Sequence, residues 1–459
     1  MGRMKTYFFV LGTNHTFSKI DIVNLLARKD VDFEIIEASE EILLISTSTE
    51  LDAKSLINEL GSAAKIGEVY GIYDKENWPD NFLKDDLTRQ NLQGNFSRVK
   101  EKFGVSVYGA GGKFKELNEV FYSSRKLKEK VKGMENMREI RESGRTLSTV
   151  AVDKNNLLNS GFELVLCVGS KGIYVGKTLA IQDYESYSRR DYGRPGRNAK
   201  SGMIPPKLAK MMINLAGKNK EDIFLDPFCG SGTFLQELVL LGYKNAIGSD
   251  VEREATNNSR INIEWLFENY RNVKKEDCKI ELFTLDARKL SSQISPKTVD
   301  AIVTEPYLGS ADRKFFKPEQ IKREVDQLEN LYLSVFQEFK KVLKNDGVVV
   351  IIFPVFRYQN KLPRSKLTRY SDVTSEKFDS LSPSSVQQAG RYSASRNQFF
   401  HLQILDKIYS LGFESGNFVT KGTKGAELLK LQITDRNSVI FFRPGQTVSR
   451  EIFVFKITP

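Results

Sequence analysis

The sequence predicts an α/β protein with a doubly wound, largely parallel sheet in its C-terminal half and two smaller α+β units before it. Three observations lead to this fold class. From about residue 205 onward, short buried-strand patterns alternate with helical patterns, as in a sheet covered by helices on both faces. Residues 1 to about 182 instead hold strands grouped around single helices. At 459 residues the chain is also long for one hydrophobic core, so two or three domains are expected.

Composition narrows the class of protein. The formal net charge of +11 favours a polyanionic partner. No run of about twenty apolar residues is present, so we predict no membrane span. The apolar start "KTYFFVLG" is followed by charges and is predicted to be a strand, not a signal peptide. The cysteines, Cys167, Cys229 and Cys278, lie far apart and the chain has 2 histidines. We therefore expect a cytoplasmic protein without a metal site.

The first two regions are predicted to be separate α+β domains. Residues 1–75 show the order β-α-β-β, with strand patterns at "KTYFFVLG", "VDFEIIEAS" and "EILLISTS" and a helix at "SKIDIVNLLARK". Residues 76–182 combine strands such as "FGVSVYG" and "FELVLCVGS" with a lysine-rich helix, "LNEVFYSSRKLKEKVKG". Residues 183–204 are polar and aperiodic, which predicts a linker or a working loop rich in arginine.

The third region opens with a turn suited to a nucleotide. Pro205 and Pro206 enter a helix, and a buried strand over 223–225 then leads to Asp226 and to Gly230-Ser231-Gly232 before the next helix. In a doubly wound sheet the ligand lies beyond the carboxyl ends of the strands, and glycines there let it approach the backbone and the helix N-terminus. A tight strand-to-helix turn without a ligand is the alternative.

Four successive strand ends carry an acidic residue: Asp226, Asp250, Asp286 and Glu305. A carboxylate at Asp250, at the end of "NAIGSD", can accept hydrogen bonds from both hydroxyls of a ribose. Asp286 can accept from an adenine amine. Any one of these carboxylates would fit a solvated loop, but all four in phase point to a ligand site.

This order of motifs resembles that of class I S-adenosylmethionine-dependent methyltransferases, which have a Rossmann-like domain. The resemblance implies that Asp226 and the glycine turn hold the methionine part of S-adenosylmethionine, Asp250 the ribose and Asp286 the adenine. It extends the donor-binding set to Phe228, Gly230, Gly232, Thr233, Val251 and Ala287. In members that methylate exocyclic amines, the fourth strand end carries a motif like Asp/Asn-Pro-Pro-Tyr.

The sequence has Glu305-Pro306-Tyr307 at that place, and we predict these three residues to be catalytic. A side-chain oxygen and a backbone carbonyl can accept the two amine hydrogens and orient the nitrogen lone pair, and an aromatic ring can stack on a flipped base. Without a gap, Tyr307 takes the place of the second proline. A shift of one residue would instead put Thr304 in the acidic place. We prefer Glu305 because a carboxylate is the better acceptor.

Two further stretches, "RRDYGRPGRNAKSGMIPPKLAKMMINLAG" and "RPGQTVSREIFVF", resemble tRNA guanosine-N2-methyltransferases of the position-ten type. The resemblance implies a ferredoxin-like domain over 1–75, an RNA-binding THUMP domain over 76–182, a linker over 183–204 and a class I methyltransferase domain over 205–459. It implies tRNA as partner and methylation of a guanosine N2 amine, and we expect a monomer. The predicted RNA contacts are Lys126, Lys130, Arg190, Arg194 and Arg197.

Residues 357–396 add a serine-rich stretch in which basic and aromatic residues are mixed, which suits phosphate contact and base stacking or, alternatively, a surface loop. Two other functions stay open. One is a DNA amino-methyltransferase acting on adenine or cytosine, and the other is a non-catalytic RNA-binding protein that keeps the fold.

Overall fold

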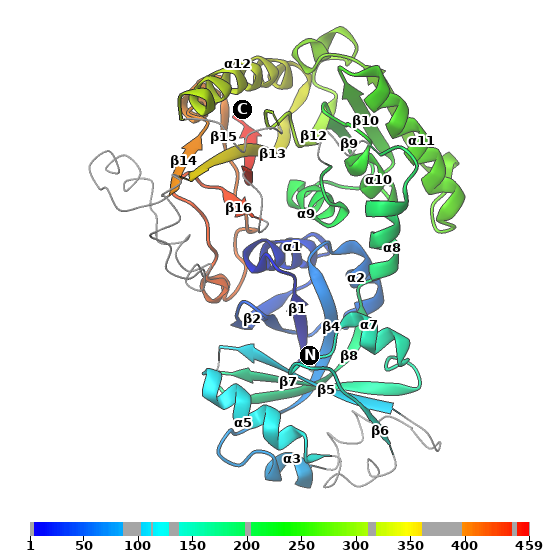
Figure 1. The fold of residues 1–459 in the computed structure, drawn as a ribbon, viewed down its shortest axis with the longest axis vertical. Helices are drawn as coiled ribbons and strands as arrows, with labels where there is room; N and C mark the ends of the chain where they lie inside the picture. Colours follow the sequence, from blue (N-terminus) through cyan, green and yellow to red (C-terminus); the bar gives the residue numbers. More distant parts are fainter. Residues whose placement is uncertain are drawn as a thin grey trace, which may run out of the picture. The chain divides into compact units, whose positions relative to one another are not determined.

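The chain folds into two compact units. The computed structural model describes residues 4–85, 102–111, 113–127, 137–197, 203–310, 318–359, 397–442 and 448–458. The N-terminal unit comprises Met1–Tyr192 together with Val419–Leu431, and the C-terminal unit comprises Gly193–Phe418 together with Gln432–Pro459 (Figure 1).

The N-terminal unit is built on one sheet with strand order β2-β3-β1-β4-β8-β7-β5-β6. Its strands are β1 (Lys5–Leu11), β2 (Phe33–Ala38), β3 (Ile42–Thr47), β4 (Ala63–Tyr73), β5 (Lys102–Ala110), β6 (Arg138–Ile140), β7 (Gly161–Gly169) and β8 (Ile173–Ile181). Its helices are α1 (His15–Arg28), α2 (Ala53–Glu59), α3 (Asp80–Lys84), α5 (Phe114–Ser124), α7 (Thr149–Lys154) and α8 (Tyr184–Ser188). A π-helical turn, η1 (Arg189–Gly193), follows α8.

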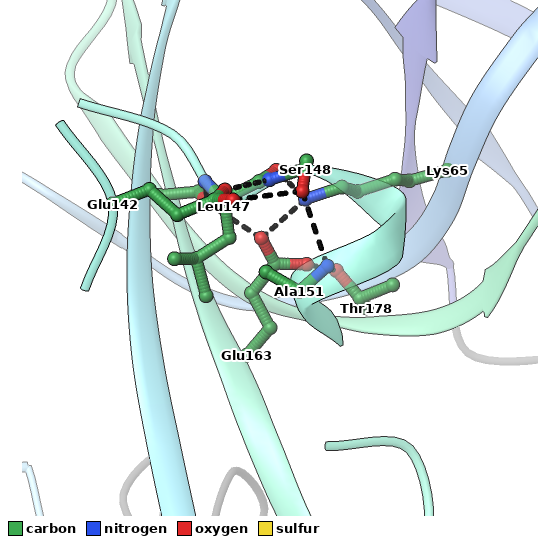
Figure 2. Close-up of polar contacts among 8 residues, drawn as sticks. Lys65, Glu142, Leu147, Ser148, Ala151, Glu163 and Thr178 are labelled. Atoms are coloured by element: carbon green, nitrogen blue, oxygen red, sulfur yellow. Dashed lines mark hydrogen bonds and ion pairs between the residues drawn. The ribbon is translucent and has the colours of Figure 1, made fainter. Parts of the chain in front are cut away.

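The two predicted N-terminal domains share this sheet, so residue 75 is not a boundary between compact units. Strand β4 pairs antiparallel with β8 from Lys65 to Tyr73. Figure 2 shows a second link, in which the buried Lys65 ammonium contacts the buried carboxylate of Glu163 on β7 and donates to the Leu147 carbonyl at 2.7 Å. Ser106 and Thr178 donate to the same carboxylate at 2.5 Å each. Removing either partner of this ion pair would leave the other charge buried and unpaired, which costs several kcal/mol.

A short segment of the C-terminal sequence, residues 419–431, also belongs to the N-terminal unit, although it was predicted to be part of the methyltransferase domain. The Ile35 amide on β2 donates to the Lys424 carbonyl at 3.1 Å, and the Lys19 ammonium donates to the Leu429 carbonyl at 2.5 Å. The Leu429 side chain, at the end of the short turn η6 (Ala426–Leu429), is fully buried in the apolar cluster that contains Leu26. Burial of this side chain is the physical reason for the assignment.

The C-terminal unit contains a mixed sheet with strand order β11-β10-β9-β12-β13-β17-β15, with β14 beside β13 and β16 beside β17. Its strands are β9 (Ile223–Asp226), β10 (Asn245–Asp250), β11 (Lys279–Thr284), β12 (Val299–Thr304), β13 (Leu343–Gln359), β14 (Asn397–His401), β15 (Phe413–Ser415), β16 (Val439–Phe441) and β17 (Val448–Ile457). Its helical segments are α9 (Pro206–Ala216), α10 (Thr233–Leu240), α11 (Arg253–Asn269), α12 (Pro318–Val342), α14 (Leu405–Ser410) and the turns η2 (Lys275–Asp277) and η3 (Ala287–Ser292).

The predicted doubly wound parallel sheet is confirmed. Strands β10, β9, β12 and β13 pair in parallel, and β17 adds antiparallel to β13. The register partners Leu225, Ile302 and Val349 lie in the same apolar cluster as the buried face of α12. The chain runs outward in one direction from β9 and in the other from β12, so the carboxyl ends of these two strands form the topological switch point of the sheet. No helix in the described ranges has the length and apolarity to cross a bilayer.

Candidate active site

The glycine turn after β9 is built for close packing on one side and open space on the other. Gly230 and Gly232 both have positive φ, 51° and 81°. A Cβ at Gly232 would lie 2.9 Å from Ser259 Oγ on α11, whereas a Cβ at Gly230 would meet no atom within 4 Å. Gly232 is therefore required by its neighbour, and Gly230 leaves room for a ligand to approach the backbone.

Asp250, at the end of β10, holds this turn in place. Its carboxylate accepts from the Gly230 amide and from the Glu252 amide, each at 3.0 Å. Val251 follows with 67% of its surface exposed, so an apolar side chain borders the turn. Each carboxylate oxygen retains acceptor capacity, and the predicted contact of Asp250 with ribose hydroxyls stays open.

Asp286 follows β11 and has a partner that the sequence analysis did not anticipate. The Arg288 guanidinium contacts both of its oxygens, with Nε at 3.0 Å from each. These hydrogen bonds hold the pKa of Asp286 below its usual value. The adjoining Ala287 is buried at the start of η3. An adenine amine at Asp286 would have to share the carboxylate with Arg288.

Asp226 and Thr304 join the two predicted halves of the site. They lie at the ends of β9 and β12, both are buried, and Thr304 Oγ1 donates to Asp226 Oδ1 at 2.7 Å. The Phe228 amide donates to the same oxygen at 3.2 Å. Burial raises the pKa of Asp226 to about 7, and the hydrogen bond from Thr304 opposes that rise. The Thr304 hydroxyl is therefore enclosed beside Asp226, and the choice of Glu305 as the amine acceptor stays a prediction.

The Glu305-Pro306-Tyr307 segment leaves β12 and is held from outside by other elements. The Glu305 carboxylate accepts from Arg450 on β17, with Nε at 2.5 Å from Oε1 and the terminal nitrogen at 3.3 Å from Oε2. On α12, Tyr332 Oη donates to the Tyr307 carbonyl at 3.0 Å. Pro306 is buried, and Tyr307 is 56% exposed. Sequence reasoning missed both partners: Tyr332 stands in no local motif, and although Arg450 lies within the stretch "RPGQTVSREIFVF", nothing there marks Glu305 as its partner.

The structure does not support two of the predicted RNA contacts. Arg190 is buried, and its guanidinium lies 4.5 Å from the Tyr187 ring centroid. Arg194 is buried as well and donates to Thr233 Oγ1 at 2.7 Å, beside the glycine turn. A buried guanidinium cannot reach an RNA phosphate without local opening. Lys126 and Arg197 are exposed. Lys130 and residues 360–396 lie outside the described part of the chain.

The residues at these strand ends fit a nucleoside donor that carries an amino acid. A buried carboxylate suits an ammonium group, Gly230 gives open backbone, and the Asp250 carboxylate contacts the glycine turn. In the described ranges, no three His, Cys, Asp or Glu side chains gather as metal ligands.

Comparisons with known proteins agree with this geometry. A family model described as "RMKL-like, methyltransferase domain" matches residues 194–378, which include both the glycine turn and Glu305. A second, described as "DNA methylase", matches residues 36–260 and so ends before Glu305. The crystal structure of TrmN from Thermus thermophilus aligns over 99% of this chain and 100% of its own, with a TM-score of 0.51 and 12% identity, which shows a shared fold. The predicted Rossmann-like methyltransferase fold is confirmed.

Curated relatives carry a specific name. The tRNA (guanine(10)-N2)-dimethyltransferase of Methanocaldococcus jannaschii is 28% identical over 49% of this chain. The aligned part covers 58% of that relative, so the match spans little more than half of its length. A protein of Methanothermococcus thermolithotrophicus, which bears the same name with the qualifier "probable", is 33% identical over 31% of this chain and 77% of its own length. On this evidence the chain belongs to the tRNA (guanine(10)-N2)-dimethyltransferase family.

Proposed function

We propose that this protein transfers a methyl group from S-adenosylmethionine to the exocyclic N2 amine of a guanosine in tRNA, at position ten. The observation that carries the proposal is the hydrogen bond from Thr304 to Asp226. It brings the predicted donor site and the strand end with Glu305 together on adjacent parallel strands. Family membership supports the same reaction, since relatives are named for position ten and for dimethylation.

The donor supplies an activated methyl group on a sulfonium. Asp226 would hold its ammonium, and the glycine turn with Asp250 would hold its nucleoside. Glu305 and a backbone carbonyl of the same segment would accept the amine hydrogens and turn the nitrogen lone pair toward the methyl carbon. The nitrogen–carbon bond forms while the carbon–sulfur bond breaks with its electron pair on sulfur, and one amine proton leaves to solvent. Tyr307 is placed to stack on the base.

Binding of tRNA would fall mainly to the N-terminal unit. Its α+β composition fits a ferredoxin-like domain joined to a THUMP domain through their shared sheet. Lys126 remains the exposed basic candidate on this unit, and Arg197 is the exposed one on the C-terminal unit. A monomer in the cytoplasm is the state we propose for the enzyme.

One observation favours a second function. The model described as "DNA methylase" covers the donor turn, so a DNA amino-methyltransferase would use the same donor site. That match does not reach Glu305, whereas the match over 194–378 does. A non-catalytic RNA-binding protein is the third possibility, and the intact glycine turn argues against it.

Methyl transfer tests the proposal directly. The protein is incubated with methyl-labelled S-adenosylmethionine and either unmodified tRNA or duplex DNA, and the labelled nucleoside is identified after digestion. Label in N2-methylguanosine or N2,N2-dimethylguanosine from tRNA is expected. Label in a DNA base would favour the second function, and donor binding without transfer would favour the third. Glu305→Ala should bind the donor normally and show reduced turnover, and wild-type turnover in this variant would remove Glu305 from the site.

A further inference from the structure

The ion pair between Glu305 and Arg450 joins residues that are 145 positions apart in the sequence. Glu305 lies just past β12, and Arg450 lies on β17, which is separated from β12 by β13. The two side chains are 11% and 9% exposed. Strand β17 places Arg450 opposite Pro354 of β13, so the main chain that carries the guanidinium is fixed by the sheet.

This arrangement fixes the carboxylate at both oxygens. A guanidinium that contacts both oxygens of a carboxylate sets its plane as well as its position. A glutamate has one more rotatable bond than an aspartate, so its carboxylate needs more restraint to hold one orientation. Each oxygen of Glu305 still has a lone pair after it accepts from Arg450, and these lone pairs can accept amine hydrogens.

We infer that Arg450 is the positioning residue for Glu305 in methyl transfer. It does not touch the base; it holds the Glu305 carboxylate in the orientation that accepts the amine hydrogens. The inference rests on the proposed function and deepens it, because it explains how a glutamate serves where related motifs carry a shorter acidic side chain. The sheet, through β17, thereby sets the geometry of the acceptor loop.

The test is a double-mutant cycle with Glu305→Ala, Arg450→Gln and the double variant. For each protein we would measure kcat with tRNA, the Kd for S-adenosylhomocysteine by calorimetry, and the thermal midpoint. Arg450→Gln should lower kcat by about a hundredfold, because a misplaced acceptor costs about that much. Its donor Kd should match the wild-type value. In the Glu305→Ala background, Arg450→Gln should cause no further loss, since its target carboxylate is gone.

Two variants separate positioning from general stability. Arg436→Gln breaks another largely buried ion pair of this unit, with Glu451 at 3.1 Å, and should lower the thermal midpoint without lowering kcat. Arg450→Lys keeps the charge and should recover part of kcat. A kcat of Arg450→Gln within twofold of wild type, or an equal further loss in the Glu305→Ala background, would overturn the inference and leave the proposed function standing. Absence of transfer by the wild-type protein would overturn both.

Discussion

In the proposed site Asp226 holds the ammonium group of the donor, and because it must be ionised to do so, donor affinity should rise with pH through neutrality. Burial raises the pKa of Asp226 to about 7, whereas an ordinary aspartate has a value of 3.8. The bound ammonium favours the ionised carboxylate, so binding lowers the pKa of Asp226 and releases a proton to solvent. At about pH 7 half of the unbound protein carries the charged form, and at about pH 6 about a tenth does. Affinity should therefore weaken about fivefold over that interval.

The assay is calorimetric titration with S-adenosylhomocysteine, which keeps the ammonium, in buffers of different ionisation enthalpy. The number of protons released per binding event should approach one below about pH 6 and fall toward zero above about pH 8. Asp226→Asn should bind weakly at every pH. Thr304→Val removes a hydrogen bond that lowers the pKa of Asp226, so the midpoint should move upward, while Thr304→Ser should keep it.

Histidines are the other side chains that ordinarily titrate near neutrality. The chain has 2 histidines. His15 belongs to the N-terminal unit, and His401 contacts Glu451. The donor's own amine loses its proton only at alkaline pH, which lowers affinity at that end and leaves the acidic limb unchanged. Stability of the unbound protein should show the opposite sign, since a carboxyl with a raised pKa stabilises the fold most when protonated. A donor Kd that stays constant from about pH 7 to about pH 5.5 would refute the reasoning.

Three further predictions concern packing. Gly232→Ala should lower both donor affinity and stability, because its Cβ would meet Ser259. Gly242 also has a positive φ but open space around it, so Gly242→Ala should affect stability alone. Thermal melts measure the stability of the two variants, and titration with the donor measures their affinity. Lys65→Met should lower the free energy of unfolding of the N-terminal unit by about 3–5 kcal/mol in denaturant unfolding, and the double variant Lys65→Met/Glu163→Met should recover stability. As a control, Lys244→Met, at an exposed ion pair, should change the free energy of unfolding by about 0.5 kcal/mol or less. Leu429→Ala should cost about 2–5 kcal/mol and the half-exposed Leu428→Ala about 0.5 or less; equal effects would contradict the assignment of residues 419–431.

The catalytic sheet could be predicted because its signals are local. Strands β9 and β10 are short and end at Asp226 and Asp250, β12 ends at Thr304 just before Glu305, and the glycine turn stands between a strand and a helix. Such patterns depend on neighbours within a few residues. The long-range contacts left no such pattern. From the sequence, Arg450 is a charged residue in a strand and would be expected to face solvent. Nothing near it in the sequence marks Glu305 as its partner. Residues 419–431 likewise gain their place only through side chains of the N-terminal unit.

The arginines after α8 also show that a local sequence pattern does not reveal whether a side chain is buried, and one of them contacts the glycine turn. Four arginines in a polar stretch predicted an RNA-binding linker, yet Arg194 is buried and donates to Thr233 at the first turn of α10. The amide of Gly196 donates to Asn262 on α11 at 2.7 Å, and Asn262 donates to the Ser231 carbonyl at 2.8 Å. Residues of the predicted linker therefore hold the glycine turn in place. A basic residue near a site thus has two possible uses: the buried Arg194 contacts the turn, whereas the side chain of Arg197 is exposed.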